Sequence, residues 1–259
     1  MLLREDDRGT LAIGQPSHAW ISGQLARAWG NARFGRVEPY EEVCLAAEQH
    51  DIGWATRDLK PLYNADTGLP RSFMEMPLDV HLQLFRDGPR ALLAQSRYAA
   101  LLVSMHGWRL YQRRALDELE APKAQAIRDF LDDQRRFQHE LIAELRSDPT
   151  TAPAAGDELI ERNSMLVWTW DYLSLALCLD WAPAMAKRAP AAVGEVDLEL
   201  TAGDDPGSVR LAPWPFEAPS VIVHCEGRRL AERCDGEDEL RAVFAEAPLE
   251  RLELSLLPG

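Results

Sequence analysis

Apolar residues recur three to four positions apart through most of residues 1–190, the spacing that places them on one face of a helix. The pattern predicts helices over residues 18–29, 39–53, 77–87, 97–119, 122–146 and 157–180. Ser17 can cap the first of these helices, and Pro39 suits the first turn of the second. Proline, asparagine and glycine interrupt residues 54–76, so we expect a long loop there, of a length that usually has a function.

The pattern changes after Pro190. The stretches VDLELTA, SVRLAPW and SVIVHCEG partly alternate apolar and polar residues, which predicts strands. DGEDELRAVFAEA predicts one amphipathic helix, and LERLELSLL predicts a last strand. We therefore expect a mainly α fold in two domains, an all-helical bundle over residues 1–190 and a small C-terminal α/β appendage with a mixed sheet over residues 191–259.

The chain of 259 residues has a formal net charge of −14, which argues against nucleic acid as a partner. Its charged start includes no apolar segment typical of a signal peptide, and its four cysteines form no CxxC pair, which indicates reduced thiols in the cytoplasm. Residues 165–181 are strongly apolar, but Asp171 and Asp180 favour a buried helix over a membrane span. We expect a cytoplasmic protein with no membrane partner, and a homodimer is compatible with the sequence.

The pair His50-Asp51 ends an apolar helical stretch, and imidazole with carboxylate suits zinc, iron or manganese. Adjacent helical residues point about 100° apart, so the two side chains can converge on an ion beside the helix end. The same chemistry recurs in apolar helical segments at His18, His81, His106 and Asp171. An unpaired Asp171 carboxylate in such a segment is costly, so it must be neutralised, paired with an internal arginine or bound to a metal. Each histidine alone can be a hydrogen-bonded core residue, but the six together favour a metal site.

The order His, His-Asp, His, His, Asp resembles that of the HD superfamily, which comprises all-helical metal-dependent phosphohydrolases, and HDIG at residues 50–53 is a frequent form of their motif. Over its length the chain resembles a bacterial family catalogued as domain of unknown function 3891, whose name implies no activity. The stretches that carry this second resemblance are QPSHAWISGQLARAWG, EQHDIGW, YAALLVSMHG and PWPF.

The HD resemblance implies one or two divalent transition-metal ions, which would be iron, manganese or zinc. The first site would comprise His18, His50, Asp51 and Asp171. His81 and His106 would complete a second site, with Asp51 as the bridging and catalytic residue. Such sites make a hydroxide nucleophile available near neutral pH, so the implied activity is hydrolysis of a small phosphorylated molecule or nucleotide.

One activity of the superfamily is not expected from the sequence, and two alternatives to a phosphohydrolase stay open. Gly107 follows His106 where the HD-GYP phosphodiesterases have a second histidine, so hydrolysis of cyclic dinucleotides is not expected. The same ligand order resembles the HD-type diiron oxygenases, such as myo-inositol oxygenase and its phosphonate-cleaving relative. The other alternative is a non-catalytic binding protein that is stabilised by its metal. Phosphate requires cationic groups, and the candidates for substrate binding are Arg57, Lys60, Arg109 and Arg113.

Overall fold

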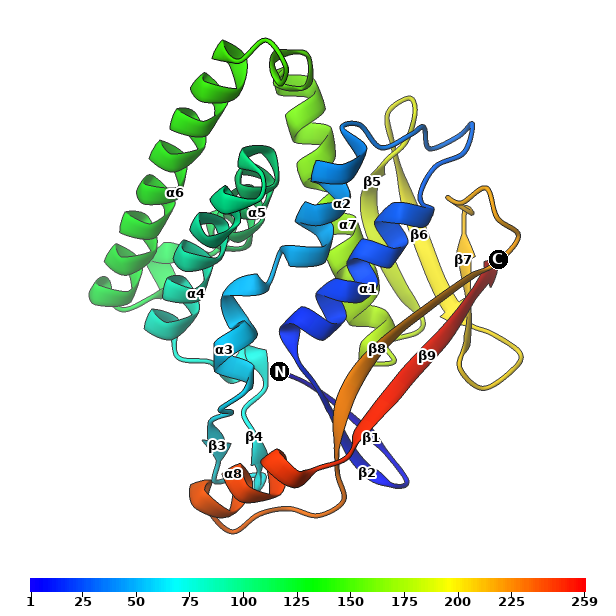
Figure 1. The fold of residues 1–259 in the computed structure, drawn as a ribbon. Coiled ribbons are helices and arrows are strands. Elements are labelled where there is room, and N and C mark those ends of the chain that lie inside the picture. Colours follow the sequence, from blue (N-terminus) through cyan, green and yellow to red (C-terminus); the bar gives the residue numbers. More distant parts are fainter.

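The computed structural model describes residues 1–259 and combines eight α-helices with a seven-stranded sheet and a two-stranded one (Figure 1). Helices, five short 3-10 helices included, contain 51% of the residues, and strands contain 22%. The helices are α1 (Gln15–Ala28), α2 (Tyr40–Gln49), α3 (Ala55–Asp58), α4 (Leu78–Ala91), α5 (Arg97–Gln112), α6 (Ala121–Ser147), α7 (Asp157–Cys178) and α8 (Glu237–Glu246). The large sheet comprises β1 (Leu2–Asp6), β2 (Gly9–Ile13), β5 (Ala184–Pro190), β6 (Glu195–Ala202), β7 (Ser208–Ala212), β8 (Val221–Leu230) and β9 (Leu249–Pro258). The small sheet pairs β3 (Tyr63–Asn64) with β4 (Leu69–Pro70).

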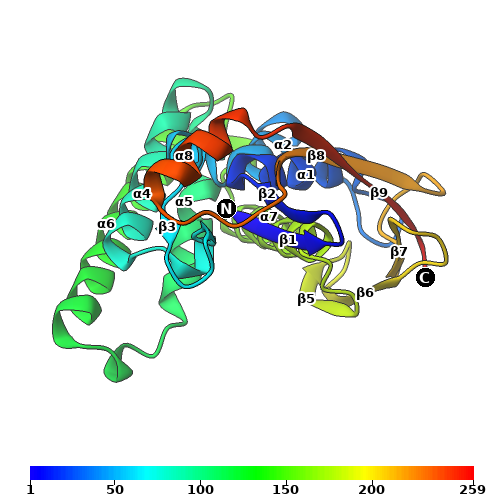
Figure 2. The same cartoon turned by 90° about the horizontal axis from the view of Figure 1, so that it is seen from below.

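The large sheet follows the order β1-β2-β8-β9-β7-β6-β5, in which only β7 and β9 are parallel neighbours. The hairpin of β1 and β2 joins β8 with Thr10 opposite Leu230, and β8 pairs with β9 with Val221 opposite Leu256. The sheet curls into a half-barrel, and the view in Figure 2 shows α1 and α7 against it. One sheet therefore links the two ends of the chain.

The predicted mainly α fold, a helical bundle with a small C-terminal appendage, is wrong. Three strands of the large sheet, β1, β2 and β5, come from residues 1–190, so this region is not all-helical. The first two strands have only five residues each, and the turn between them is charged, as a solvated chain terminus also is. The sequence pattern therefore gives no clear sign of these strands. That turn depends on Gly9, whose φ of +107° favours glycine and whose Cβ position would lie 2.3 Å from the carbonyl oxygen of Leu230.

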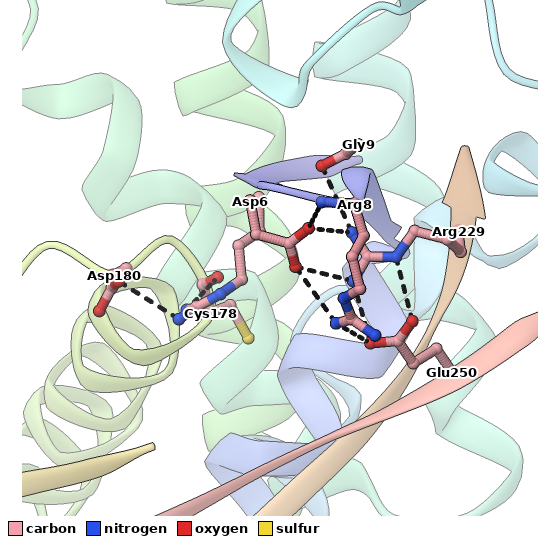
Figure 3. A network of polar contacts seen from close by, with 8 residues as sticks. Asp6, Arg8, Gly9, Cys178, Asp180, Arg229 and Glu250 are labelled. Atoms are coloured by element: carbon pink, nitrogen blue, oxygen red, sulfur yellow. Dashed lines mark hydrogen bonds and ion pairs between the residues drawn. The ribbon is translucent and has the colours of Figure 1, made fainter. Parts of the chain in front are cut away.

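Charged residues of this first hairpin form an ion-pair network across the sheet (Figure 3). Arg229 of β8 donates hydrogen bonds to Asp6 of β1 at 3.0 Å and to Glu250 of β9 at 2.9 Å. Arg4, also on β1, pairs with Asp180, just after α7, at 3.3 Å. Several linked charges hold a geometry better than an isolated surface pair does. The residues that read as a charged start therefore attach β1 to the sheet and to α7.

One hydrophobic core joins the sheet to the helices. Ile21 and Leu25 of α1 and Leu173 of α7 pack in the same buried cluster as Leu198 of β6 and Val223 of β8. In Figure 1, α1 and α7 lie between the sheet and the group of α4, α5 and α6. A helix that is covered on both sides needs apolar residues all round, which explains the almost continuous apolar sequence of α7. The division at residue 190 stays a prediction, and the sheet takes strands from both sides of it.

The six predicted helices are present as α1, α2, α4, α5, α6 and α7, with shifted ends. The fourth of them ends at Gln112, and the third continues to Ala91. The expected loop over residues 54–76 includes α3 and the β3–β4 hairpin, and the hydroxyl of Tyr63 donates to the carbonyl oxygen of Cys234 at 2.9 Å. None of the helices has both the length and the apolar character that crossing a membrane requires.

Candidate metal centre

Four helices bring together five of the six residues that the sequence predicts as metal ligands. The five, from α1, the end of α2, α5 and α7, are His18, His50, Asp51, His106 and Asp171. Each of these residues is at most 8% exposed. Imidazoles and carboxylates buried to this extent require partners, because the loss of hydration is otherwise uncompensated.

The end of α2 explains how the neighbours His50 and Asp51 both face the centre. The helix ends at Gln49, and Asp51 has φ −111° and ψ 22°, outside the helical region. The glycine of the HDIG sequence, Gly53, packs so closely on α4 that a Cβ there would lie 2.2 Å from the carbonyl oxygen of Leu84. This close approach fixes the path of the chain after the helix and, with it, the direction of the Asp51 side chain.

The five side chains form two overlapping groups that share His50. His18, His50 and Asp51 offer ligand atoms within 4.8 Å of one another, and so do His50, His106 and Asp171. Nε2 of His18 lies 2.9 Å from Oδ2 of Asp51, and Nε2 of His50 lies 3.2 Å from Oδ1 of Asp171. Nε2 of His106 lies 3.8 Å from Oδ2 of Asp171. The arrangement offers ligands for one or two ions.

Hydrogen bonds behind the centre fix the orientation of two of its histidines. Nδ1 of His50 donates to the carbonyl oxygen of Ala47 at 2.8 Å. The hydroxyl of Ser174 donates to the carbonyl oxygen of Asp171 at 2.8 Å, so it accepts from Nδ1–H of His18, also at 2.8 Å. Both rings therefore direct Nε2 toward the centre, the orientation that metal-binding histidines have.

Burial and the close carboxylates together set the protonation of the centre. Burial by itself lowers the pKa of His50, but Asp51 and Asp171 outweigh it and raise this pKa to about 9. Burial opposes the ionisation of both carboxyl groups, yet the adjacent histidines hold the pKa values of Asp51 and Asp171 below their usual range. For His106, burial outweighs the attraction of Asp171 and lowers the pKa to about 4. At neutral pH, His50 keeps its proton unless an ion replaces it.

Unpartnered atoms within the centre test whether a metal ion fits it. Nε2 of His50, Oδ1 of Asp51 and Nδ1 of His106 are buried and have no hydrogen-bond partner. Three imidazoles with two carboxylates form a donor set that suits iron, manganese or zinc, whereas calcium takes oxygen ligands alone. The residues therefore fit a divalent transition-metal ion.

A cavity of about 290 Å³ opens on the centre. The residues of the centre that line it are His18, Asp51, His106 and Asp171. His81, the sixth predicted ligand, lines the same cavity but belongs to neither ligand group. Its Nδ1 is hydrogen-bonded to the hydroxyl of Tyr111, and burial lowers its pKa to about 4, so the ring is neutral at pH values near neutrality.

None of the four residues predicted to bind substrate lines this cavity. Arg109 is buried and makes an ion pair with a glutamate of α7, and Arg113 is exposed with its guanidinium over a tryptophan ring. Arg57 lines a separate surface hollow, and Lys60 is exposed. Arg114 is the one arginine or lysine that lines the cavity, so it replaces the four predicted residues as the candidate for binding an anion.

Three residues of the centre and its cavity were not predicted from the sequence: Arg114, Tyr111 and Ser174. Arg114 lies beyond the end of α5, where helical spacing from His106 no longer predicts direction, and its guanidinium lies 4.9 Å from the centre of the Tyr111 ring. Ser174 follows Asp171 by three residues and so shares its helix face, a signal that can be read from the sequence. Tyr111 follows His106 by five residues, a spacing that gives no such signal.

Comparison with known proteins gives a family and no activity. The model of a family described as "Protein of unknown function (DUF3891)" matches residues 1–232, a range that includes the whole centre and every residue that lines its cavity. No curated protein and no solved structure matches the chain. The function therefore has to be argued from the chemistry of the centre.

Proposed function

This chain belongs to the family described as protein of unknown function DUF3891, and we propose that it is a metal-dependent hydrolase of small phosphorylated molecules with a centre of the HD-superfamily type. The observation that carries the proposal is the cluster of five buried ligand-type side chains, four of which line a cavity of about 290 Å³. Two residues that carry unpartnered atoms, Asp51 and His106, are among those that line the cavity.

The proposed ligands divide between two positions. The first ion would be held by His18, His50 and Asp51. His106 and Asp171 of the second group would bind a second ion. A bound divalent ion lowers the pKa of coordinated water toward neutrality and polarises a phosphoryl oxygen. His81 is left out of the ligand set because it belongs to neither group of ligand atoms that lie within 4.8 Å of one another.

The cavity favours catalysis over a purely structural metal. Structural metal sites are closed by protein ligands on all sides, whereas catalytic sites keep a position open for water or substrate. Here His18, Asp51, His106 and Asp171 all line open space. A protein that kept its metal for stability alone would not need this access.

Arg114 favours a phosphorylated substrate over the neutral polyol that a diiron oxygenase would oxidise. Its side chain lines the cavity in a chain whose net charge is −14, so this cation lies against the overall charge of the protein. A guanidinium can bind phosphate oxygens through two parallel hydrogen bonds, which matches the charge and the shape of a phosphoryl group.

Metal analysis of the purified protein, together with release of phosphate from p-nitrophenyl phosphate, tests the proposal. We expect about one or two equivalents of iron, manganese or zinc, and loss of both metal and turnover in Asp51→Asn, because a buried ligand is removed. His139→Ala is the matched control, since this histidine is exposed on α6 and should leave both readouts unchanged.

Equal, low metal contents in the wild type and in Asp51→Asn would refute the metal centre. About two irons per chain with oxygen consumption and no phosphate release would refute hydrolysis in favour of the diiron alternative. The absence of a nucleic-acid partner, the homodimer and the cytoplasmic location stay predictions.

A further inference from the structure

Apart from the metal centre, the lining of the cavity is mostly apolar. Eight of the 15 lining residues are hydrophobic. The segment around Phe73, Met74 and Met76 supplies part of this apolar lining, and Phe85 of α4 and Leu110 of α5 supply another part. A sugar or another polyhydroxylated body would lose water in such a cavity and regain few hydrogen bonds. The lining therefore suits a substrate whose organic part is apolar.

A single cation, Arg114, lines the cavity. Its guanidinium lies over the ring of Tyr111, with 4.9 Å between the guanidinium carbon and the ring centroid. Stacking on an aromatic ring leaves the edge of the guanidinium free to bind an anion. A di- or triphosphate has further phosphate groups, and no second arginine or lysine lines the cavity to bind them. The charge of the lining therefore suits one phosphate monoester group.

The volume of the cavity limits the size of the substrate. The volume is about 290 Å³, near the lower end of the range for small-molecule pockets. A pocket of this size favours the phosphate ester of a ring or of a short alkyl chain over a whole nucleotide.

From these three properties we propose that the substrate is a small phosphate monoester with an apolar organic group, whose phosphate binds between the metal centre and Arg114. This inference rests on the proposed function and specifies its substrate class. It assigns Arg114 as the residue that selects a single phosphate group, and it assigns the apolar lining around Phe73 as the surface that binds the ester group.

Steady-state hydrolysis by the full-length, manganese-loaded protein tests the substrate class. Phenyl phosphate, glycerol 2-phosphate, AMP and ATP serve as probes that differ in the polarity, size and charge of the leaving group. We expect the highest kcat/KM for phenyl phosphate, by about tenfold or more over the other three. Arg114→Ala should lower kcat/KM for phenyl phosphate about 10- to 100-fold, since a hydrogen bond to a charged group is lost. Arg113→Ala, an exposed neighbour outside the cavity, is the matched control and should stay within about twofold.

Calorimetric binding of phenylphosphonate, which cannot be hydrolysed at an ester bond, separates this inference from the proposed function. Binding that depends on Arg114 but is accompanied by no hydrolysis of any probe would refute the hydrolase and leave the site chemistry standing. Hydrolysis with a preference for AMP or ATP, or equal effects of Arg114→Ala and Arg113→Ala, would overturn the inference and leave the hydrolase standing. Neither binding nor hydrolysis would overturn both.

Discussion

The hydroxyl of Ser174 holds His18 in the orientation that metal binding needs, and Ser174→Ala should therefore weaken metal binding. This hydroxyl accepts from Nδ1–H of His18 and donates to the carbonyl oxygen of Asp171, each at 2.8 Å. Ser174 is fully buried, so water does not replace the lost acceptor. The variant leaves a buried N–H without a partner and leaves the ring free to rotate or to change tautomer.

Ser174→Ala should lower both the stability of the metal-free protein and its metal affinity. An unsatisfied buried donor costs about 1–3 kcal/mol, which should appear in the free energy of unfolding of the metal-free variant. Loss of the residue that orients a metal-binding histidine lowers metal affinity about 10- to 100-fold, or about 1.4–2.8 kcal/mol. Urea unfolding in the presence of a chelator measures the first quantity, and competition with a fluorescent zinc chelator measures the second.

Ser22→Ala is the matched control for this prediction. Ser22 lies next to Ser174, with 3.0 Å between the two hydroxyl oxygens, but it does not contact His18 through a hydrogen bond. The control should lose about 0.5–1.5 kcal/mol of unfolding free energy and keep its metal affinity within about threefold. If Ser174→Ala kept wild-type zinc affinity while losing stability, the hydrogen bond would be structural only and the argument about His18 would be refuted.

Three further predictions concern neighbouring features. Gly53→Ala should lower the free energy of unfolding by about 1–3 kcal/mol in urea titrations, because its Cβ would lie 2.2 Å from the carbonyl oxygen of Leu84 and α4 would have to move; an unchanged midpoint would contradict this close packing. Zinc affinity should rise about tenfold per pH unit from about pH 7 up to pH 9 in competition titrations, because the ion must displace the proton of His50, whose pKa is raised to about 9; a flat profile would contradict it. The same raised pKa stabilises the metal-free fold below pH 6.5, and this stabilisation is lost as the pH rises through about 9. Arg109→Met should cost about 1–2 kcal/mol of unfolding free energy, because the bond to Glu161 at 3.0 Å is lost, while kcat/KM for phenyl phosphate stays within about threefold; a larger kinetic loss would restore Arg109 as a substrate-binding residue.

The helices could be predicted from the sequence because their periodicity extends over many residues. The 27 residues of α6 keep one buried and one exposed face, and α7 keeps its apolar character over six turns. The sheet could not be predicted as a whole, because its membership depends on contacts between distant segments. Leu2 and Leu11 lie in five-residue strands, and only the presence of β8, more than 200 residues later, gives them a sheet to join. The local pattern therefore predicted a separate C-terminal appendage, whereas the C-terminal strands form one sheet with the hairpin of β1 and β2.

In the candidate site, too, some residues could be predicted from the sequence and others could not. A buried carboxylate such as Asp171 is conspicuous in an apolar helix, because burying it without a partner is costly, so the sequence itself marks it as a ligand candidate. Arg114 lies at the exposed end of α5 among other arginines, where a charged residue costs nothing and therefore carries no signal. His81 has the same sequence setting as His106, but the structure places it in the wall of the cavity and in neither ligand group. The metal centre is thus predictable from the cost of its burial, whereas the groups that select a substrate become visible only when the cavity they line has been built.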